Sequence, residues 1–139
     1  MAQTLTGGCL CGAVRYKVSA DFIFSGKCYC EDCRKGGSTG HSSVIAVPEG
    51  SVSITGKLTE FKKNGGSGQP ITRRFCPVCG SRISAVAQVM PGIMMVTAST
   101  LDDPEKFVSK MSVFASRAPS WDRPPTSTPV FAEMPPQQG

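Results

Sequence analysis

The chain has 139 residues, 40 % hydrophobic and 18 % charged, which is typical of one globular domain with its own core. No stretch approaches the roughly 20 apolar residues that cross a bilayer, and the first twelve residues lack the basic and apolar regions of a secretory signal, so we expect a cytoplasmic protein without a membrane partner. The formal net charge of +5 counts all seven cysteines as neutral and would shrink if they became metal-bound thiolates. With only 7 % aromatic residues, the composition predicts no nucleic-acid partner.

The sequence predicts eight or nine short strands and almost no helix. In residues 13–18, apolar and basic side chains alternate, which is the period of a half-buried strand. Further segments rich in β-forming residues, separated by Gly and Pro, are 43–47, 51–55, 57–63, 71–75, 81–89, 93–100 and 107–115. The loop "NGGSG" at 64–68 predicts a hairpin, and only residues 31–35 and 102–106 could form a helical turn each. Short strands at regular spacing indicate an all-β sheet or sandwich.

The C-terminal part of the chain changes in composition. Residues 118–139 hold six of the eleven prolines and cannot form a central strand. Trp121 and Phe131 predict that most of this part packs against the domain, because large aromatic side chains gain by burial. We therefore predict a single domain over residues 1–133 and a flexible tail over 134–139.

The seven cysteines fall into three clusters, and a disulfide framework is a poor explanation for an odd number without an export signal. The pairs Cys9-x-Cys11 and Cys76-x₂-Cys79 each place two sulfurs on one side of a short turn. The glycines that follow Cys11 and Cys79 suit a metal knuckle, where the backbone often needs a positive φ. "CLCGAVRY" and "CPVCGSRI" share this pattern, which predicts two similar knuckles at one metal.

The third cluster is the triplet Cys28, Cys30 and Cys33. Two pairs make a closed four-thiolate site, which is the pattern of a structural Zn²⁺. Three ligands on one short loop leave a fourth position for water or substrate, which is the pattern of a catalytic Zn²⁺.

Other assignments of the cysteines stay open at this point. His41 lies eight residues after Cys33 and could close the triplet site, although a lone histidine is more often exposed. Alternatively, one triplet cysteine is a redox nucleophile beside a single structural zinc, with Arg34 and Lys35 lowering its pKa. A third option is a non-catalytic zinc module that binds glutathione or a protein.

The segments "GGCLCGAVRY", "CYCEDCRKGGS" and "RRFCPVCGSRI" closely resemble the glutathione-dependent formaldehyde-activating enzyme family, which includes centromere protein V. The resemblance runs from Gly7 to about Trp121. It implies an all-β, tent-like sandwich of short antiparallel strands joined by zinc and related to methionine sulfoxide reductase B. It also implies one structural Zn²⁺ and one catalytic Zn²⁺. Their ligands are, in that order, Cys9, Cys11, Cys76 and Cys79, then Cys28, Cys30 and Cys33.

The family's reaction is the addition of glutathione to formaldehyde, which gives S-hydroxymethylglutathione, and the reverse reaction makes the enzyme a carbon–sulfur lyase. A thiol bound to zinc loses its proton, which prepares it to attack a carbonyl. Lys27, Arg34 and Lys35 flank the triplet and could hold the glutathione carboxylates. Family members often carry His where this chain has Tyr29, for which packing is the favoured role. The sequence leaves the oligomeric state open, with a homodimer as one option.

Overall fold

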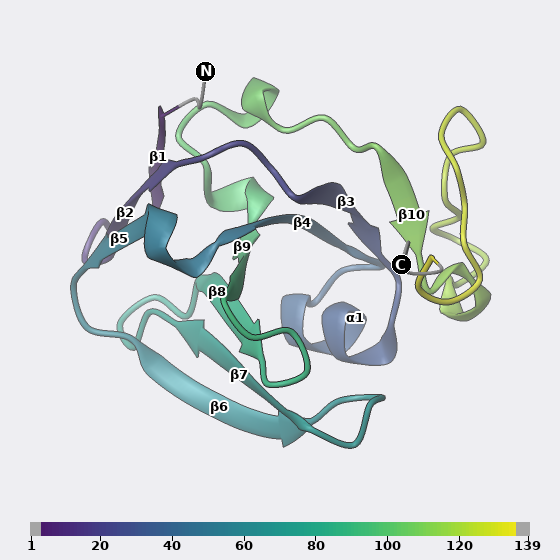
Figure 1. Cartoon of the computed structure of the whole chain (residues 1–139), viewed down its shortest axis with the longest axis horizontal. Coiled ribbons are helices and arrows are strands. Elements are labelled where there is room, and N and C mark those ends of the chain that lie inside the picture. Colours follow the sequence, from purple (N-terminus) through teal and green to yellow (C-terminus); the bar gives the residue numbers. More distant parts are fainter. Residues whose placement is uncertain (1–3, 136–139) are drawn as a thin grey trace.

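The computed structural model describes residues 4–135, which form two β-sheets (Figure 1). The smaller sheet is antiparallel, with the order β1–β2–β5. Its strands are β1 (Thr4–Gly8), β2 (Arg15–Ser19) and β5 (Val52–Thr55). The larger sheet has the order β10–β3–β4–β9–β8–β7–β6. Its strands, in chain order, are β3 (Phe24–Cys28), β4 (Ser42–Pro48), β6 (Thr59–Asn64), β7 (Pro70–Phe75), β8 (Arg82–Ala87), β9 (Ile93–Thr97) and β10 (Met111–Val113). Every pair in it is antiparallel except β10 with β3.

The helical content of residues 4–135 is small, as predicted. The helix α1 (Glu31–Gly37) follows β3 and lies between β4 and the β6–β7 hairpin in Figure 1. Asp32 on α1 pairs with Lys63 of β6 at 2.7 Å and with Arg73 of β7 at 3.4 Å, which ties the helix to that hairpin. Four single-turn 3₁₀ helices complete the list: η1 (Glu49–Ser51), η2 (Ala98–Thr100), η3 (Pro104–Lys106) and η4 (Ala115–Arg117).

The hydrophobic core lies between the two sheets. Val14, Tyr16 and Val18 are buried, while the alternate residues Arg15 and Lys17 are exposed, which confirms the predicted period of two. Facing side chains come from β4, β8 and β9: Ile45, Val47, Ile83, Met94 and Val96. Removing these apolar surfaces from water is the main force that holds the sheets together. The prediction of an all-β sandwich is thereby confirmed.

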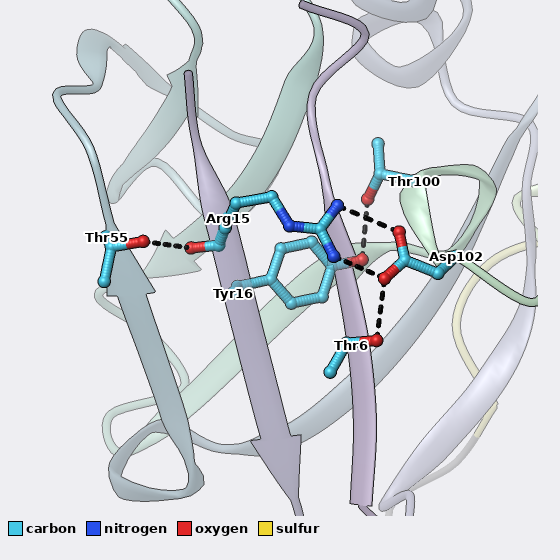
Figure 2. Close-up of polar contacts among 6 residues, drawn as sticks. All are labelled: Thr6, Arg15, Tyr16, Thr55, Thr100 and Asp102. Carbon is cyan, nitrogen blue, oxygen red and sulfur yellow. Dashed lines mark hydrogen bonds and ion pairs between the residues drawn. The ribbon is translucent and has the colours of Figure 1, made fainter. Parts of the chain in front are cut away.

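A polar cluster attaches the turn after β9 to the smaller sheet (Figure 2). Asp102 accepts hydrogen bonds from Arg15 Nη1 at 2.9 Å and from Thr6 Oγ1 at 2.7 Å, and it forms an ion pair with the same arginine. The hydroxyls of Tyr16 and Thr100 lie 2.7 Å apart. Arg15 and Asp102 are both almost half exposed, so this ion pair adds little to the free energy of folding. Its main effect is to hold the turn after β9 against the smaller sheet.

The proline-rich C-terminal segment, residues 114–133, runs back beside β10 (Figure 1). Ser112 of β10 accepts a backbone hydrogen bond from Phe131 at 2.9 Å and donates one to Pro129 at 3.0 Å. The prediction that this segment packs against the domain is confirmed. The prediction for Trp121 is wrong: its side chain is 72 % exposed, because backbone hydrogen bonds hold the segment and the indole is not needed for it. Residues 136–139 of the predicted tail lie outside the described range.

Candidate metal centres

Four cysteines from two distant turns come together in the structure. Cys9 and Cys11 lie between β1 and β2, and Cys76 and Cys79 lie between β7 and β8. Their four sulfurs all lie within 4.8 Å of one another. The Cys11 sulfur is 3.6 Å from that of Cys9 and 3.7 Å from that of Cys76. Tetrahedral Zn–S bonds of about 2.3 Å place sulfurs about 3.8 Å apart, so the type, number and spacing of these donors fit Zn²⁺.

The two turns that carry these cysteines are built alike, as their shared sequence pattern predicts. Gly12 and Gly80 have φ values of 83° and 78°, a region that costs a residue with a side chain about 1–2 kcal/mol. The Gly12 N–H donates to the carbonyl of Cys9 at 3.2 Å, and the Gly80 N–H donates to that of Cys76 at 2.9 Å. Each glycine therefore closes a turn that points two sulfurs the same way.

The second turn also supplies hydrogen-bond donors to its sulfurs. The backbone N–H groups of Val78 and Cys79 lie 3.4 and 3.5 Å from the Cys76 sulfur. Hydrogen bonds from the side chain and the backbone of Ser81 lower the pKa of the Cys79 thiol to about 5. Such donors favour the thiolate, which is the form that binds a metal.

The triplet Cys28, Cys30 and Cys33 forms a second group of sulfurs within 4.8 Å of one another. Cys28 ends β3, Cys30 is the N-cap of α1, and Cys33 lies in the first turn of that helix. The backbone of Cys30 is extended, and its sulfur accepts the N–H of Cys33 at 3.3 Å. Cysteine thus takes the position that Ser, Asp or Asn usually holds, and one turn of chain brings three sulfurs together.

Hydrogen bonds among the triplet sulfurs favour one shared negative charge. Bonds from the Cys28 and Cys33 thiols lower the pKa of Cys30 to about 2. The hydrogen bond to Cys30 also raises the pKa of Cys28, because the donor then keeps its proton. A bound metal would replace the two remaining protons as the positive partner of these sulfurs.

The three cations predicted beside the triplet differ in their surroundings. Lys35 pairs with Glu31 at 2.9 Å, and both side chains are well exposed. Lys27 stands on β3 next to Cys28, and within residues 4–135 neither it nor Arg34 forms an ion pair. Their role toward a substrate stays a prediction.

Two other arginines act on the triplet that the sequence analysis did not single out. Arg82 of β8 packs against α1 so closely that a Cβ on Gly36 would lie 2.9 Å from its Nη1 atom. That Nη1 is buried without a hydrogen-bond partner among the described residues. The hydrogen bond with Cys28 and the charge of Arg82 act to lower the pKa of the Cys33 thiol, but the hydrogen bond with Cys30 and burial raise it overall to about 12. Arg117 of η4 interacts electrostatically with the other two triplet sulfurs. Both arginines are remote from the triplet in sequence, so no local pattern indicates them.

His41 and Tyr29 lie beside the triplet on neighbouring strand ends. Tyr29 is fully buried, which agrees with the packing role that we favoured, and its ring centre is 4.9 Å from that of His41. The Nδ1 atom of His41 lies 2.6 Å from Asp122 Oδ2, in the C-terminal segment. The lone histidine is therefore three-quarters buried and hydrogen-bonded rather than exposed, and this nitrogen is not available to a metal.

Comparison with known proteins identifies the family. The family model described as "Glutathione-dependent formaldehyde-activating enzyme" matches residues 4–117, which include all seven cysteines. This chain belongs to that family. Membership of the glutathione-dependent formaldehyde-activating enzymes supports a function related to glutathione and formaldehyde, and the two cysteine groups are compatible with zinc.

Among solved structures, a Rhodobacter sphaeroides protein from a structural genomics programme has a similar fold. It matches with a TM-score of 0.57 and 21 % identity, over 73 % of this chain and 94 % of the other. At this identity the likeness supports the fold alone. No curated protein matches the sequence significantly. None of the helices in residues 4–135 is long and apolar enough to span a membrane. The predicted relation to methionine sulfoxide reductase B stays a prediction.

Proposed function

We propose that the chain is a zinc-dependent carbon–sulfur lyase of the S-(hydroxymethyl)glutathione synthase type. The observation that carries this proposal is the triplet, whose three sulfurs lie within 4.8 Å of one another on a single turn of chain. Cys28, Cys30 and Cys33 would hold the catalytic Zn²⁺, and Cys9, Cys11, Cys76 and Cys79 the structural one. When bound at the triplet, zinc would supply Lewis acidity toward a fourth ligand such as the substrate thiol.

The residues around the triplet fit an anionic thiol. Three thiolates give a zinc site a net charge of −1, and a fourth thiolate makes it −2, so nearby cations are needed to offset this charge. Arg82 and Arg117 act on the triplet sulfurs, and the predicted cations Lys27, Arg34 and Lys35 lie on the flanking chain. Guanidinium groups also suit the carboxylates of glutathione. Glutathione as the thiol and a cytoplasmic location both rest on the family.

The first test counts zinc per chain by elemental analysis and reactive thiols on the same sample, purified without added metal or chelator. We expect two zinc ions and no fast thiol. The second test uses NMR exchange spectroscopy to measure the interconversion of glutathione and formaldehyde with S-hydroxymethylglutathione above the uncatalysed rate. The double variant C30S/C33S should stay folded, bind one zinc and lose the catalysed exchange. A variant that keeps the full catalysed rate would refute the assignment of the triplet.

A second candidate is a thiol redox enzyme, which the low pKa of Cys30 favours. It predicts one zinc ion per chain and one to three rapidly reacting thiols in the triplet. Zinc added back to such a sample decides between the two: if a second equivalent still fails to bind, the redox function replaces the zinc-activated thiol.

A further inference from the structure

The strand β6 forms one edge of the larger sheet and lies at the outer side of the molecule in Figure 1. It pairs with β7 along one side, and no strand of the described residues lies along the other. At the opposite edge of the same sheet, the C-terminal segment forms backbone hydrogen bonds with Ser112 of β10. All six residues of β6 are exposed, which holds for no other strand in residues 4–135. The edge at β6 is therefore open to a further strand.

The backbone groups that face this open edge belong to alternate residues of β6. The Gly65 N–H donates to the carbonyl of Gln69 at 2.9 Å, which closes the hairpin between β6 and β7. Hydrogen-bonded positions alternate in an antiparallel pair, so the odd-numbered residues of β6 direct their N–H and C=O groups to β7. The even-numbered residues direct theirs to the open edge, and they are Glu60, Lys62 and Asn64.

The open edge also carries two charges of opposite sign. Within residues 4–135, neither Glu60 nor Lys62 forms an ion pair. Lys63 differs from them, because it is paired with Asp32 of α1. Between the two free charges stands Phe61, whose side chain is 55 % exposed. The edge thus presents an acid, an aromatic ring and a base in succession.

A second copy of this chain complements that succession. When β6 pairs antiparallel with β6 of a second copy, a two-fold axis at Phe61 places the two Phe61 residues opposite each other. Glu60 of each copy then faces Lys62 of the other, so each free charge gains a partner of opposite sign. Both positions also have free backbone groups, so each of these two pairs exchanges two backbone hydrogen bonds.

The charges select this register over its neighbours. An axis at Lys62 would place two ammonium groups opposite each other, and an axis at Glu60 would do the same to two carboxylates. Like charges at directly opposite positions destabilise a pair of strands. A lysine on an edge strand usually prevents pairing. Here Glu60, two positions before Lys62, supplies the opposite charge in the one register centred on Phe61.

We propose that the chain forms a symmetric dimer, in which the β6 strands of two copies pair antiparallel about Phe61 and join the two larger sheets. This inference does not depend on the proposed function. Pairing of two edge strands buries little surface, and interfaces below about 1,200 Å² are typical of weak, reversible complexes. We therefore expect a dissociation constant of about 10–100 µM for the zinc-loaded, full-length protein.

Analytical ultracentrifugation of a dilution series measures this constant in the unaltered protein and in charge variants. Glu60→Lys and Lys62→Glu each turn both ion pairs into like-charge pairs, so each should raise the dissociation constant by at least about 10-fold. The double variant E60K/K62E restores opposite charges and should dimerise like the unaltered protein. An equimolar mixture of the two single variants should also dimerise, because each then supplies the charges that the other lacks.

The control is Lys17→Glu, which makes the same change of charge on an exposed residue of β2. It should leave the dissociation constant unchanged. Amide hydrogen exchange gives an independent readout of the geometry. The N–H groups of Glu60 and Lys62 should exchange more slowly as the protein concentration rises, whereas that of Phe61, which already faces β7, should not change.

An unaltered protein that stays monomeric at millimolar concentration overturns the inference. A dimer with the same dissociation constant in the unaltered protein and in both single variants overturns it too, because another surface then joins the copies. If the single variants dissociate and their mixture stays monomeric, the register about Phe61 is wrong. None of these results changes the zinc content or the catalysed exchange expected from the proposed function.

Discussion

The two cysteine groups should differ sharply in what they contribute to stability. The perturbation is the double substitution C9S/C11S, which removes one half of the four-cysteine group. The matched change is C30S/C33S, which removes two thiolates from the triplet and keeps a good N-cap on α1, because serine is favoured at that position.

The magnitude follows from the length of chain that each group closes. Cys11 and Cys76 are 65 positions apart, whereas Cys28 and Cys33 are five positions apart. In the chain-entropy description, a cross-link over the longer loop stabilises the folded state by about 4 kcal/mol. Loop-closure entropy scales with 1.5RT times the logarithm of length, so the longer cross-link is worth about 2 kcal/mol more than the shorter one. The free energy of unfolding of a domain of this size is about 5–15 kcal/mol, so C9S/C11S should leave about 1–11 kcal/mol of it.

Urea unfolding at fixed free zinc, followed by circular dichroism, measures both variants. We expect C9S/C11S to lower the free energy of unfolding by about 4 kcal/mol and C30S/C33S to lower it by about 2 kcal/mol less. Zinc content on the same samples shows which ion each variant has lost. If C30S/C33S proves as destabilising as C9S/C11S, the division into one structural and one catalytic group is wrong.

Two further substitutions and one control substitution test the local structure by the same urea assay. Gly80→Ala should lower the free energy of unfolding by about 1–2 kcal/mol. This cost comes from the positive φ alone, because no atom lies close to where the new Cβ would be. The control Gly50→Ala has the same open space and no positive φ, so it should change the free energy of unfolding by less than about 0.5 kcal/mol. If Gly80→Ala and Gly50→Ala lower the free energy of unfolding equally, the turn at Cys76 and Cys79 does not depend on a glycine with positive φ. Asp32→Asn should cost about 1–3 kcal/mol, since Arg73 then lies mostly buried without a charged partner and Lys63 loses its contact. An unchanged unfolding midpoint in Asp32→Asn would mean that packing alone holds α1 against the β6–β7 hairpin.

Local patterns predicted the parts of the fold that depend on local physics. The alternation in residues 13–18 predicted a strand with one buried face, and the glycines after Cys11 and Cys79 predicted positive φ. The strands β1 and β3 were not predicted. Their sequences, "TLTGG" and "FSGKC", contain glycine and polar residues, and they become strands because neighbouring strands pair with them.

In the candidate site, too, local patterns predicted some features, and contacts between distant parts of the chain determine the others. Local spacing indicated the three cysteine clusters, and counting ligands predicted that the two pairs form one group and the triplet another. Arg82 and Asp122 were not predicted, since they reach the triplet and His41 only through the folded chain. Trp121 shows the opposite error: residue type suggested burial, but the position of the segment leaves the indole exposed.

The separation of the two knuckles also has a consequence for synthesis on the ribosome. After Cys11, the ribosome must add 65 further residues to reach Cys76. At usual translation rates this synthesis takes about 3–13 s. The triplet is complete within six residues, so its three sulfurs exist together on the nascent chain long before the four sulfurs of the other group do. During this interval Cys9 and Cys11 are unpartnered thiols on a nascent chain. Oxidation of Cys9 or Cys11 in this interval would remove sulfur donors of the four-cysteine group before Cys76 and Cys79 have been synthesised.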